Sequence, residues 1–256
     1  MPLTFSIITC TWNSEPFLAQ SIDSVQSQDY PHFEQIFVDG GSEDGTLERI
    51  QALGDRANWV TGVRGGIAHA MNVGIKMATG DVVAHLHSDD YYLDAQVLSD
   101  VADAFTKTDA QWLFGRTKTD LGNVLEVPSW SMPTYSRKRL LRGNFIAHPA
   151  TFVRRSMYER CGVFDENIKY AMDYDLWLRL SKHADPVFVN RWIAAFRRHS
   201  GSLSSANALA ALADDYRVRC NYLGLNPLSR GYHCLIHTVR KQRSLKAAQP
   251  QVIEEK

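Results

Sequence analysis

Residues 35–46 read QIFVDGGSEDGT, a short apolar run that leads directly into a polar turn. An uninterrupted apolar run of this kind is typical of a strand buried on both faces of a parallel sheet. The Asp, Gly and Ser residues that follow are favoured in turns and at helix N-termini, and residues 46–53 continue with helical periodicity. This strand–turn–helix unit predicts an α/β fold.

The same unit recurs along the first hundred residues. The expected strands are 4–9, 35–38, 59–61 and 81–86, and the expected helices are 16–26, 46–53, 66–79 and 93–105. Their alternation indicates βαβ units and a mostly parallel sheet flanked by helices. Further strands are expected at 111–117, 124–127 and 187–189, and further helices at 173–183, 203–223 and 229–243. We expect one domain over residues 1–200, with halves 1–105 and 106–200, and a basic helical extension over 201–256.

The composition is that of a globular protein of 256 residues, with 45% hydrophobic and 22% charged residues. It excludes a disordered chain, a collagen-like chain and a disulfide-stapled miniprotein. The 28 basic and 28 acidic residues cancel, so no nucleic-acid partner is expected. The four cysteines form no CxxC pair, and we expect reduced thiols. With no basic n-region and no apolar run of membrane-spanning length, the chain is expected to be cytoplasmic, either soluble or peripheral on the inner face of the plasma membrane.

Charge is unevenly distributed near the C-terminus. No acidic residue lies between Asp215 and Glu254, whereas seven basic residues do. Apolar residues recur at helical spacing within 229–246. Two alternatives follow: a surface helix that lies on an anionic membrane, or an ordinary terminal helix that packs its apolar stripe on the domain.

Polar residues follow three of the expected strands. They are residues 9–13 (TCTWN), 39–46 (DGGSEDGT) and 87–90 (HSDD). Each stretch also has an ordinary interpretation as a turn or a helix N-terminus. Because ligands of open α/β sheets bind beyond the carboxyl ends of the strands, the three stretches together predict one binding crevice. The adjacent carboxylates of Asp89 and Asp90 repel each other, and a bound divalent cation would relieve that repulsion.

The ordered set of motifs resembles family 2 glycosyltransferases of the GT-A fold. Residues 6–13 (SIITCTWN) are similar to the family's first strand and its end, residues 38–46 (VDGGSEDGT) to its VDDGSxDGT element, and residues 66–74 (GIAHAMNVG) to its GxxxAxNxG element. Residues 173–179 (DYDLWLR) resemble the segment that carries the catalytic base. The resemblance spans about residues 4–200. It implies the Rossmann-like GT-A sheet and a likeness to bacterial surface-polysaccharide (colanic-acid-type) transferases.

The resemblance also implies a nucleotide-sugar donor, by default a UDP-sugar with guanosine and thymidine as alternative nucleosides, and Mg²⁺ or Mn²⁺ as the cofactor. It places the nucleotide sugar in the half 1–105 and the acceptor in the half 106–200. Asp90 would hold the cation together with Asp89, and Asp173 would be the general base. The implied donor-binding residues are Thr9, Thr11, Asn13, Asp39, Asp44, Arg64, Asn72 and Asp89.

The chain departs from the family pattern at two of these motifs. His87 stands where the family often has Asp, and Met172 precedes the expected base where Glu is frequent. Asp175 is an alternative base, but residues two apart on a helix face different directions, and we favour Asp173 because it begins the helix. Four residues have a site role and a plain structural or solvated role as alternatives: His148 beside the acceptor cleft, and Arg197, Arg198 and His199 as a clamp on the diphosphate. Core positions are expected for Trp12, Trp130 and Trp177.

The function that the resemblance implies is inverting, metal-dependent transfer of a sugar to a glycan or polyprenyl-linked acceptor in polysaccharide biosynthesis. A nucleotide-sugar-binding module without turnover is one alternative, since it would share the donor site but not need Asp173. A metallo-hydrolase is another, with residues 85–90 (HLHSDD) as an HxHxDH motif, although the last histidine is absent and residues 39–46 are left unexplained. A nucleotidyltransferase would need a glycine- and lysine-rich phosphate loop that residues 9–15 lack.

Overall fold

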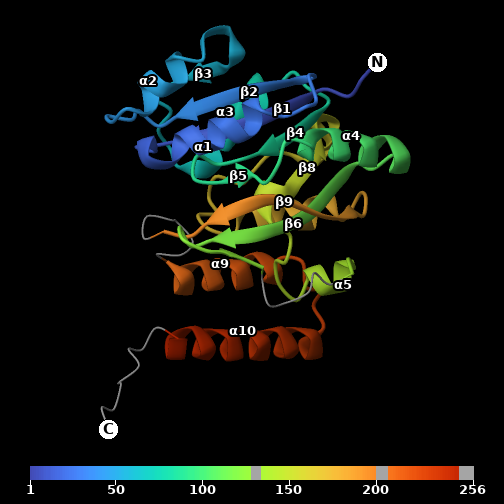
Figure 1. The fold of residues 1–256 in the computed structure, drawn as a ribbon. Coiled ribbons are helices and arrows are strands. Elements are labelled where there is room, and N and C mark those ends of the chain that lie inside the picture. The colour runs from blue at the N-terminus through green and yellow to red at the C-terminus, as the bar shows by residue number, and fades with distance from the viewer. Residues whose placement is uncertain (128–133, 200–206, 248–256) are drawn as a thin grey trace.

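A mixed sheet lies at the centre of the molecule, and helices cover both of its faces (Figure 1). The computed structural model describes residues 1–127, 134–199 and 207–247. Within this part of the chain the strand order is β3-β2-β1-β4-β8-β6-β9-β5, with β7 paired to β6.

The first half of the sheet is parallel. Its elements are β1 (Phe5–Thr11), α1 (Glu15–Gln26), β2 (Phe33–Asp39), α2 (Thr46–Gln51), the 3₁₀ turn Gly54–Arg56, β3 (Asn58–Val60), α3 (Ile67–Met77) and β4 (Val82–His85). All seven residues of β1 are buried, because parallel strands are covered on both faces. β1 pairs in parallel with β2 and with β4, so the carboxyl ends of these strands share one edge of the sheet.

The second half of the sheet contains antiparallel pairs. Its elements are β5 (Tyr91–Tyr92), α4 (Val97–Thr108), β6 (Trp112–Asp120), β7 (Leu125–Glu126), α5 (Arg137–Leu140), the 3₁₀ turn His148–Ala150, β8 (Thr151–Arg154), α6 (Arg155–Cys161), α7 (Met172–Leu180) and β9 (Val187–Arg197). β8 runs antiparallel to both β4 and β6, whereas β6 and β9 are parallel. The pairing of β5 with the end of β9 brings Arg197 close to the residues that follow β4.

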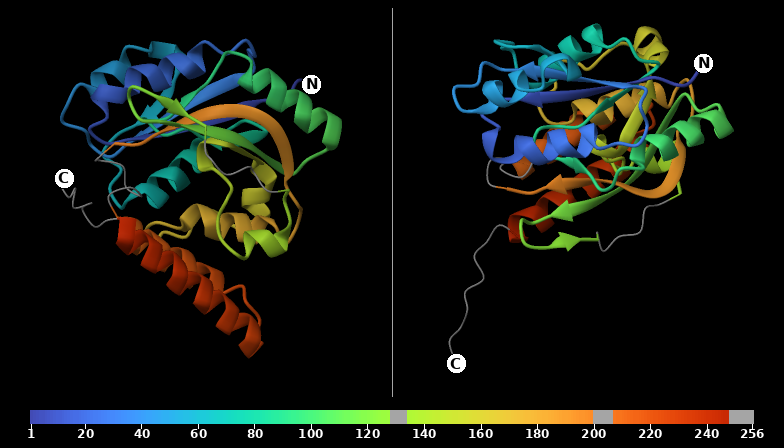
Figure 2. Two further views of the ribbon diagram at one scale, coloured as in Figure 1. Left: turned by 60° about the horizontal axis from the view of Figure 1, so that its bottom comes forward. Right: turned by 45° about the horizontal axis from the view of Figure 1, so that its top comes forward.

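Helices cover both faces of the sheet (Figure 2). The two larger hydrophobic clusters pack against opposite faces. On one face, α3 and α7 cover the strands, and the buried rings of Trp112 and Trp177 stack with centroids 5.7 Å apart. A stacked aromatic pair adds about 0.5–1.5 kcal/mol to the stabilisation from burial itself. On the other face, Leu98 and Phe105 of α4 pack with Phe5 of β1.

Two further helices lie beyond α7. α9 (Ala208–Cys220) packs on α7, and α10 (Pro227–Ala247) packs on α9 as the outermost layer (Figure 1). The rings of Tyr216 and His237 stack between the two helices with centroids 4.4 Å apart. One face of α10, which includes the buried His233, therefore packs against the protein. The apolar residues Tyr232, Leu235 and Val239 remain exposed, so the packed face is not the apolar stripe that the second alternative expected.

The α/β fold and the helical C-terminal region agree with the sequence prediction, and most element boundaries differ by a few residues. Two of these differences have a clear cause in strand pairing. α4 begins at Val97 instead of residue 93, because Tyr91 and Tyr92 first pair with β9. β9 continues to Arg197 instead of ending at 189, since Trp192 and residues 194–197 also pair with β6. β8, α5 and α6 were not predicted. All four cysteines are free thiols. Trp130 and residues 203–206 of an expected helix lie outside the described residues.

Candidate functional site

The Asp39 carboxylate joins the ends of β1 and β2. The parallel register pairs Asp39 with Thr11, whose hydroxyl donates to Oδ1 at 3.0 Å. The Ser42 hydroxyl (2.5 Å) also donates to Oδ1, and the N–H groups of Gly41 (2.8 Å) and Ser42 (3.0 Å) and the Thr61 hydroxyl (2.7 Å) donate to Oδ2. Burial by itself raises the pKa of Asp39, but these hydrogen bonds outweigh it and lower the pKa. Asp39 therefore stays ionised and fixes the turn that follows β2.

Two other expected donor-binding residues also connect the ends of these strands. Asn13, with a φ of 49°, accepts a hydrogen bond from the Glu43 N–H at 2.9 Å. Asp44 accepts from the N–H groups of Glu15 (3.1 Å) and Thr46 (3.0 Å). Both side chains thus hold the turn after β2 against the start of α1.

Exposed side chains flank the Asp39 turn. Arg64 lies over Gly41, which has a φ of 88°. The guanidinium is so close that a Cβ on residue 41 would lie 3.1 Å from Arg64 Nη2. Trp12 is 67% exposed directly after β1, so the expectation of a core position is wrong for this residue, whereas Trp177 is buried as expected. An indole and a guanidinium are therefore available to a ligand here. Thr9 is fully buried, and its hydroxyl has no hydrogen-bond partner among the described residues.

The acidic pair follows β4. Asp90 is almost fully buried and accepts a hydrogen bond from the Arg197 N–H at 3.1 Å. Burial, together with the neighbouring charge of Asp89, raises the pKa of Asp90 well above its usual value. The Asp89 carboxylate lies 3.0 Å from His199 Nε2. A cation beside this pair would offset both the desolvation and the repulsion.

The guanidinium of Arg197 is already engaged within the protein. It pairs with Asp120 (Nε–Oδ2 3.3 Å), hydrogen-bonds Gln20 and lies over the ring of Phe17 with a centroid distance of 4.8 Å. In this structure Arg197 anchors the end of β9, which places its N–H on Asp90. Its role as a clamp on the diphosphate stays a prediction. Arg198 is exposed and, with His199, lines a neighbouring hollow of about 640 Å³.

The chemistry of the donors after β4 and β9 fits a divalent cation. Asp89 and Asp90 offer carboxylate oxygens, which Mg²⁺ and Mn²⁺ prefer, and His199 offers an imidazole nitrogen. Across residues 1–127, 134–199 and 207–247, no three such side chains are set close enough to one another to form a metal site. The rings of His85 and His87, the histidines of the metallo-hydrolase alternative, each lie 5.3 Å from that of His148. These three rings form no metal-binding group in the described part of the chain, and His85 is buried against the ring of Phe164.

Asp173 lies in the first turn of α7. Its carboxylate accepts hydrogen bonds from the Tyr174 N–H (2.6 Å) and from Asn144 Nδ2 (3.1 Å). Burial, with a smaller contribution from the charge of Asp215, raises the pKa of Asp173 to about 6 in spite of these hydrogen bonds. A carboxylate with a pKa near the working pH can both accept and release a proton.

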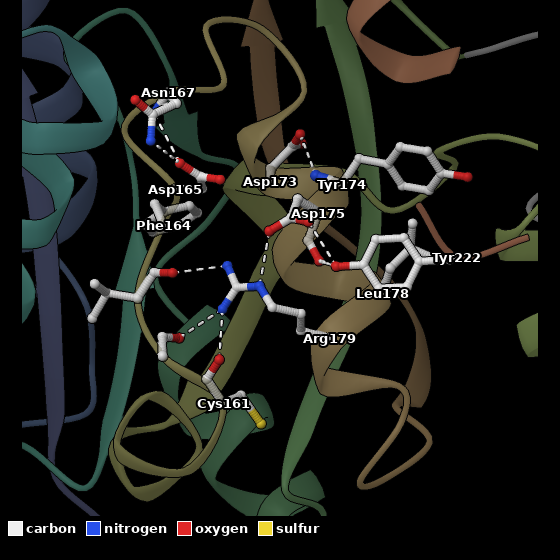
Figure 3. Close-up of polar contacts among 12 residues, drawn as sticks. Cys161, Phe164, Asp165, Asn167, Asp173, Tyr174, Asp175, Leu178, Arg179 and Tyr222 are labelled. Atoms are coloured by element: carbon white, nitrogen blue, oxygen red, sulfur yellow. Dashed lines mark hydrogen bonds and ion pairs between the residues drawn. The ribbon is translucent and has the colours of Figure 1, made fainter. Parts of the chain in front are cut away.

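Asp175 faces away from Asp173 and is tied into the protein (Figure 3). It pairs with Arg179 (Nε–Oδ2 2.8 Å) and accepts a hydrogen bond from the Tyr222 hydroxyl at 2.6 Å. Arg179 also donates to the carbonyls of Cys161, Gly162 and Val163. Asp175 therefore has a structural role.

His148 connects the two halves of the site. Its ring lies 5.3 Å from that of His87, which follows β4, and 5.7 Å from that of Trp177 on α7. Trp177 lies one turn beyond Asp173 on the same helix face. Burial lowers the pKa of His148 well below its usual value, so the ring is neutral. Packed rings thus link the acidic pair to the helix that carries Asp173.

Comparison with known proteins identifies the family. The model of the family "Glycosyl transferase family 2" matches residues 6–162, more than half of the chain. The chain belongs to glycosyl transferase family 2. It is 26% identical to an uncharacterized glycosyltransferase of Rickettsia typhi over 212 residues, which cover 78% of this chain and 65% of that protein. It is 29% identical to a Pasteurella multocida chondroitin synthase, covering 73% of this chain and 20% of the synthase.

Solved structures share the fold of this family 2 chain. S. aureus TarS 1–349 in complex with UDP has a TM-score of 0.71 at 20% identity, over 95% of this chain and 72% of that one. The mannosyltransferase PcManGT of Pyrobaculum calidifontis, in complex with GDP-Man and Mn²⁺, has a TM-score of 0.68 at 15% identity, over 98% and 77%. Both likenesses show the GT-A fold.

Several residues that shape the site of this family 2 chain were missed in the sequence. Thr61 donates to Asp39, Asn144 donates to Asp173, and Trp12 is exposed beside the Asp39 turn. No local pattern separates Thr61 or Asn144 from other polar loop residues. The position of Trp12 directly after an expected strand was the one signal that could have indicated exposure.

Asn72, an expected donor-binding residue, is buried and used inside the protein. Its amide exchanges two hydrogen bonds of 2.9 Å with the backbone of Phe164 and donates to Glu166 at 2.9 Å. Asn72 therefore ties α3 to the segment before α7.

We expect Asn72→Ala to lower the free energy of unfolding by about 1–3 kcal/mol, because the buried N–H and C=O of Phe164 lose their partner. Urea unfolding measures this loss, with the exposed Asn167→Ala on the same segment as the matched control. A variant as stable as the parent would contradict the structural role. A folded Asn72→Ala variant that binds UDP more weakly than the parent would support the expectation that Asn72 contacts the donor.

Proposed function

We propose that this chain transfers a sugar from a nucleotide-sugar donor to a hydroxyl group of a glycan or polyprenyl-linked acceptor, with inversion at the anomeric carbon. The observation that carries this proposal is Asp173, a half-buried carboxylate whose pKa is raised to about 6. Its helix packs toward the acidic pair through the rings of Trp177 and His148. The fold neighbours that bind UDP, UDP-GlcNAc and GDP-Man support a nucleoside-diphosphate sugar, with UDP as the default. Relatives named chondroitin and hyaluronan synthase support polysaccharide biosynthesis.

In this mechanism Asp173 is the general base. Its carboxylate accepts the proton of the acceptor hydroxyl while that oxygen attacks the anomeric carbon. The bond from that carbon to the diphosphate oxygen breaks on the opposite face, and a single displacement inverts the configuration. Asn144 and the Tyr174 N–H hold the carboxylate in place before the attack.

The residues after β4 and β9 would hold the cation and the diphosphate. We assign Mg²⁺ or Mn²⁺ to Asp90, with Asp89 and His199 beside it. The bound cation would neutralise the negative charge that develops on the departing nucleoside diphosphate. Arg197 positions Asp90 through its backbone N–H, and the exposed Arg198 lies next to it.

The nucleoside would bind at the ends of β1 and β2. We assign it to the Asp39 turn, with Thr9, Thr11, Asn13 and Asp44 building the wall. Asp39 already accepts five hydrogen bonds, so its main contribution is to fix the turn whose backbone faces the ligand. Trp12 and Arg64 would contact the base or the diphosphate from the rim.

Replacing the base separates transfer from binding. We expect Asp173→Asn to reduce kcat by roughly 10²–10⁴-fold with nearly unchanged donor affinity, because the amide cannot accept the proton. Radiolabelled-sugar transfer and UDP calorimetry measure the two quantities. Asp175→Asn is the control: it should destabilise the fold by about 3 kcal/mol through loss of the Arg179 pair while the folded enzyme keeps its kcat. Transfer by Asp173→Asn would overturn the assignment, and a parent that binds but never transfers would favour the binding module.

The pH profile reports the same carboxylate. The base must be ionised, so kcat/KM should fall about tenfold per pH unit as the pH drops below about 6, and should be flat just above it. A profile without an acid limb between about pH 5 and 7 would argue against Asp173.

The cation site is tested by thermal shift. We expect UDP with Mn²⁺ to raise the Tm of the parent more than UDP alone, by the mass action of a ligand that binds only the folded state. Asp90→Ala should remove the Mn²⁺-dependent part, whereas Asp103→Ala on the surface of α4 should keep it. A Mn²⁺ effect that survives Asp90→Ala would relocate the metal.

We also propose that the outer face of α10 lies on an anionic membrane surface. Leu228, Tyr232, Leu235 and Val239 recur at helical spacing and are 84%, 46%, 63% and 38% exposed. Basic residues flank this stripe, and no acidic residue lies between Asp215 and Glu254. Such a helix binds with its apolar stripe in the headgroup layer and its cations on anionic lipid. No helix in the described part of the chain has the length and hydropathy needed to cross a bilayer.

Vesicle co-sedimentation tests the α10 face. We expect the double variant Leu228→Ser, Leu235→Ser to bind vesicles of phosphatidylglycerol and phosphatidylcholine at least about tenfold more weakly, through loss of two buried apolar side chains. Leu209→Ser, on an exposed leucine of α9, should bind like the parent. The proposal would be refuted if the double variant bound these vesicles as tightly as the parent does. It would also be refuted if the parent bound vesicles of pure phosphatidylcholine and not those that contain phosphatidylglycerol.

A further inference from the structure

The two C-terminal helices reach the loop that touches the proposed base. α9 packs on α7, and α10 packs on α9, so residues far along the chain surround residues 142–144. Those three residues follow α5, and the last of them, Asn144, contacts Asp173. The described contacts between these segments are polar, and one of the side chains that make them, Arg219, is fully buried.

We propose that Asp215, Arg219 and Arg240 are positioning residues of the transfer reaction, because they clamp the loop 142–144 and thereby hold Asn144 against Asp173. The inference rests on the proposed role of Asp173. It makes the α9–α10 pair a part of the active site instead of an appended layer.

Arg219 forms one side of the clamp. It is fully buried, and its Nη1 donates to the carbonyl of Arg142 at 2.5 Å and lies 3.7 Å from the Asp215 carboxylate. A buried guanidinium is costly unless it is paired, so its position is fixed by these two partners. Residue 142 is therefore held at a defined distance from α9.

Asp215 and Arg240 form the other side of the clamp. Asp215 is mostly buried, the nearby Asn144 N–H acts to lower its pKa against the effect of burial, and Arg240 Nη1 lies 3.9 Å from its carboxylate. The Arg240 guanidinium covers Gly143 so closely that a Cβ at this position would collide with it. The loop is thus enclosed between α9 and α10 on both sides of Gly143.

Asn144 transmits this position to the base. Its backbone N–H faces the Asp215 carboxylate, its Oδ1 accepts from the Ile146 N–H at 3.1 Å, and its Nδ2 donates to Asp173 at 3.1 Å. With both ends of its side-chain amide hydrogen-bonded, Asn144 has one defined orientation. A continuous chain of contacts therefore runs from Arg240 through Asp215 and Asn144 to Asp173.

The clamp also acts on Asp173 through charge. The groups that face Asp173 are the Tyr174 N–H of α7, Asn144 of the loop and Asp215 of α9, with Arg219 and Arg240 behind Asp215. The negative charge of Asp215 raises the pKa of Asp173, whereas the hydrogen bond from Asn144 lowers it. Removing one or the other should move the pKa of the base in opposite directions.

The pH profile of kcat/KM for the full-length protein tests the clamp. We expect Asp215→Asn, which keeps the side-chain shape, to move the acid limb down by roughly 0.5–1 pH unit, because a like charge is removed. We expect Asn144→Ala to move it up by a similar amount, because the ionised base loses a donor. Arg240→Gln, on a partly exposed side chain, should also move the acid limb up, because the positive charge that offsets the effect of Asp215 on the pKa of Asp173 is then lost. A role in folding alone would change Tm and kcat without opposite shifts of the limb.

Asp214→Asn is the matched control on the same helix. The Asp214 carboxylate faces the Tyr170 N–H (3.1 Å) and Arg217 (3.2 Å), away from the loop 142–144 contacts described above. We expect the acid limb of the Asp214→Asn variant to coincide with that of the parent. Acid limbs of Asp215→Asn, Asn144→Ala and Arg240→Gln that all coincide with the parent would overturn the inference, as would shifts of one common sign. If Asp173→Asn is inactive in the same assay, such a result removes the clamp alone; if Asp173→Asn still transfers, the proposed base itself fails.

Discussion

The hydrogen bonds around Asp39 are the constraint on which the first half of the site depends. Parallel pairing of β1 and β2 ends both strands at the same edge, and Asp39 accepts donors from the end of β1, from the turn after β2 and from Thr61 after β3. One buried carboxylate thus fixes three segments that are separate in sequence. Because its hydrogen bonds keep it ionised in spite of burial, the turn is rigid before any ligand arrives.

In the second half of the site the pKa of the carboxylates is raised instead of lowered. Burial raises the pKa of both Asp90 and Asp173, and neither has the dense shell of donors that surrounds Asp39. A desolvated carboxylate destabilises the fold, and such groups gather where chemistry requires them. These surroundings suit the proposed roles of Asp90 as a cation ligand and of Asp173 as the base. The fully hydrogen-bonded Asp39 suits binding, whereas the desolvated Asp90 and Asp173 suit the reaction.

Local pattern was sufficient for most of the fold. The apolar runs that became β1, β2 and β4 and the amphipathic periods that became α1 and α3 are written in consecutive residues. The helix geometry also separated Asp173 from Asp175, because side chains two residues apart diverge. β8 was missed, since four residues that pair antiparallel with β4 and β6 carry no pattern longer than themselves.

By itself the sequence determined which residue types follow the strands, and hence the family and the chemistry that the carboxylates offer. Only the tertiary structure decided which of them are engaged: Arg197 is bound to Asp120, Asn72 to Phe164 and Asp175 to Tyr222, whereas Trp12 is exposed. It also decided that α9 and α10 reach the Asn144 loop. Hydrogen bonds and ion pairs join residues more than seventy positions apart, and the energy of such a contact depends on distances that no local stretch of sequence encodes.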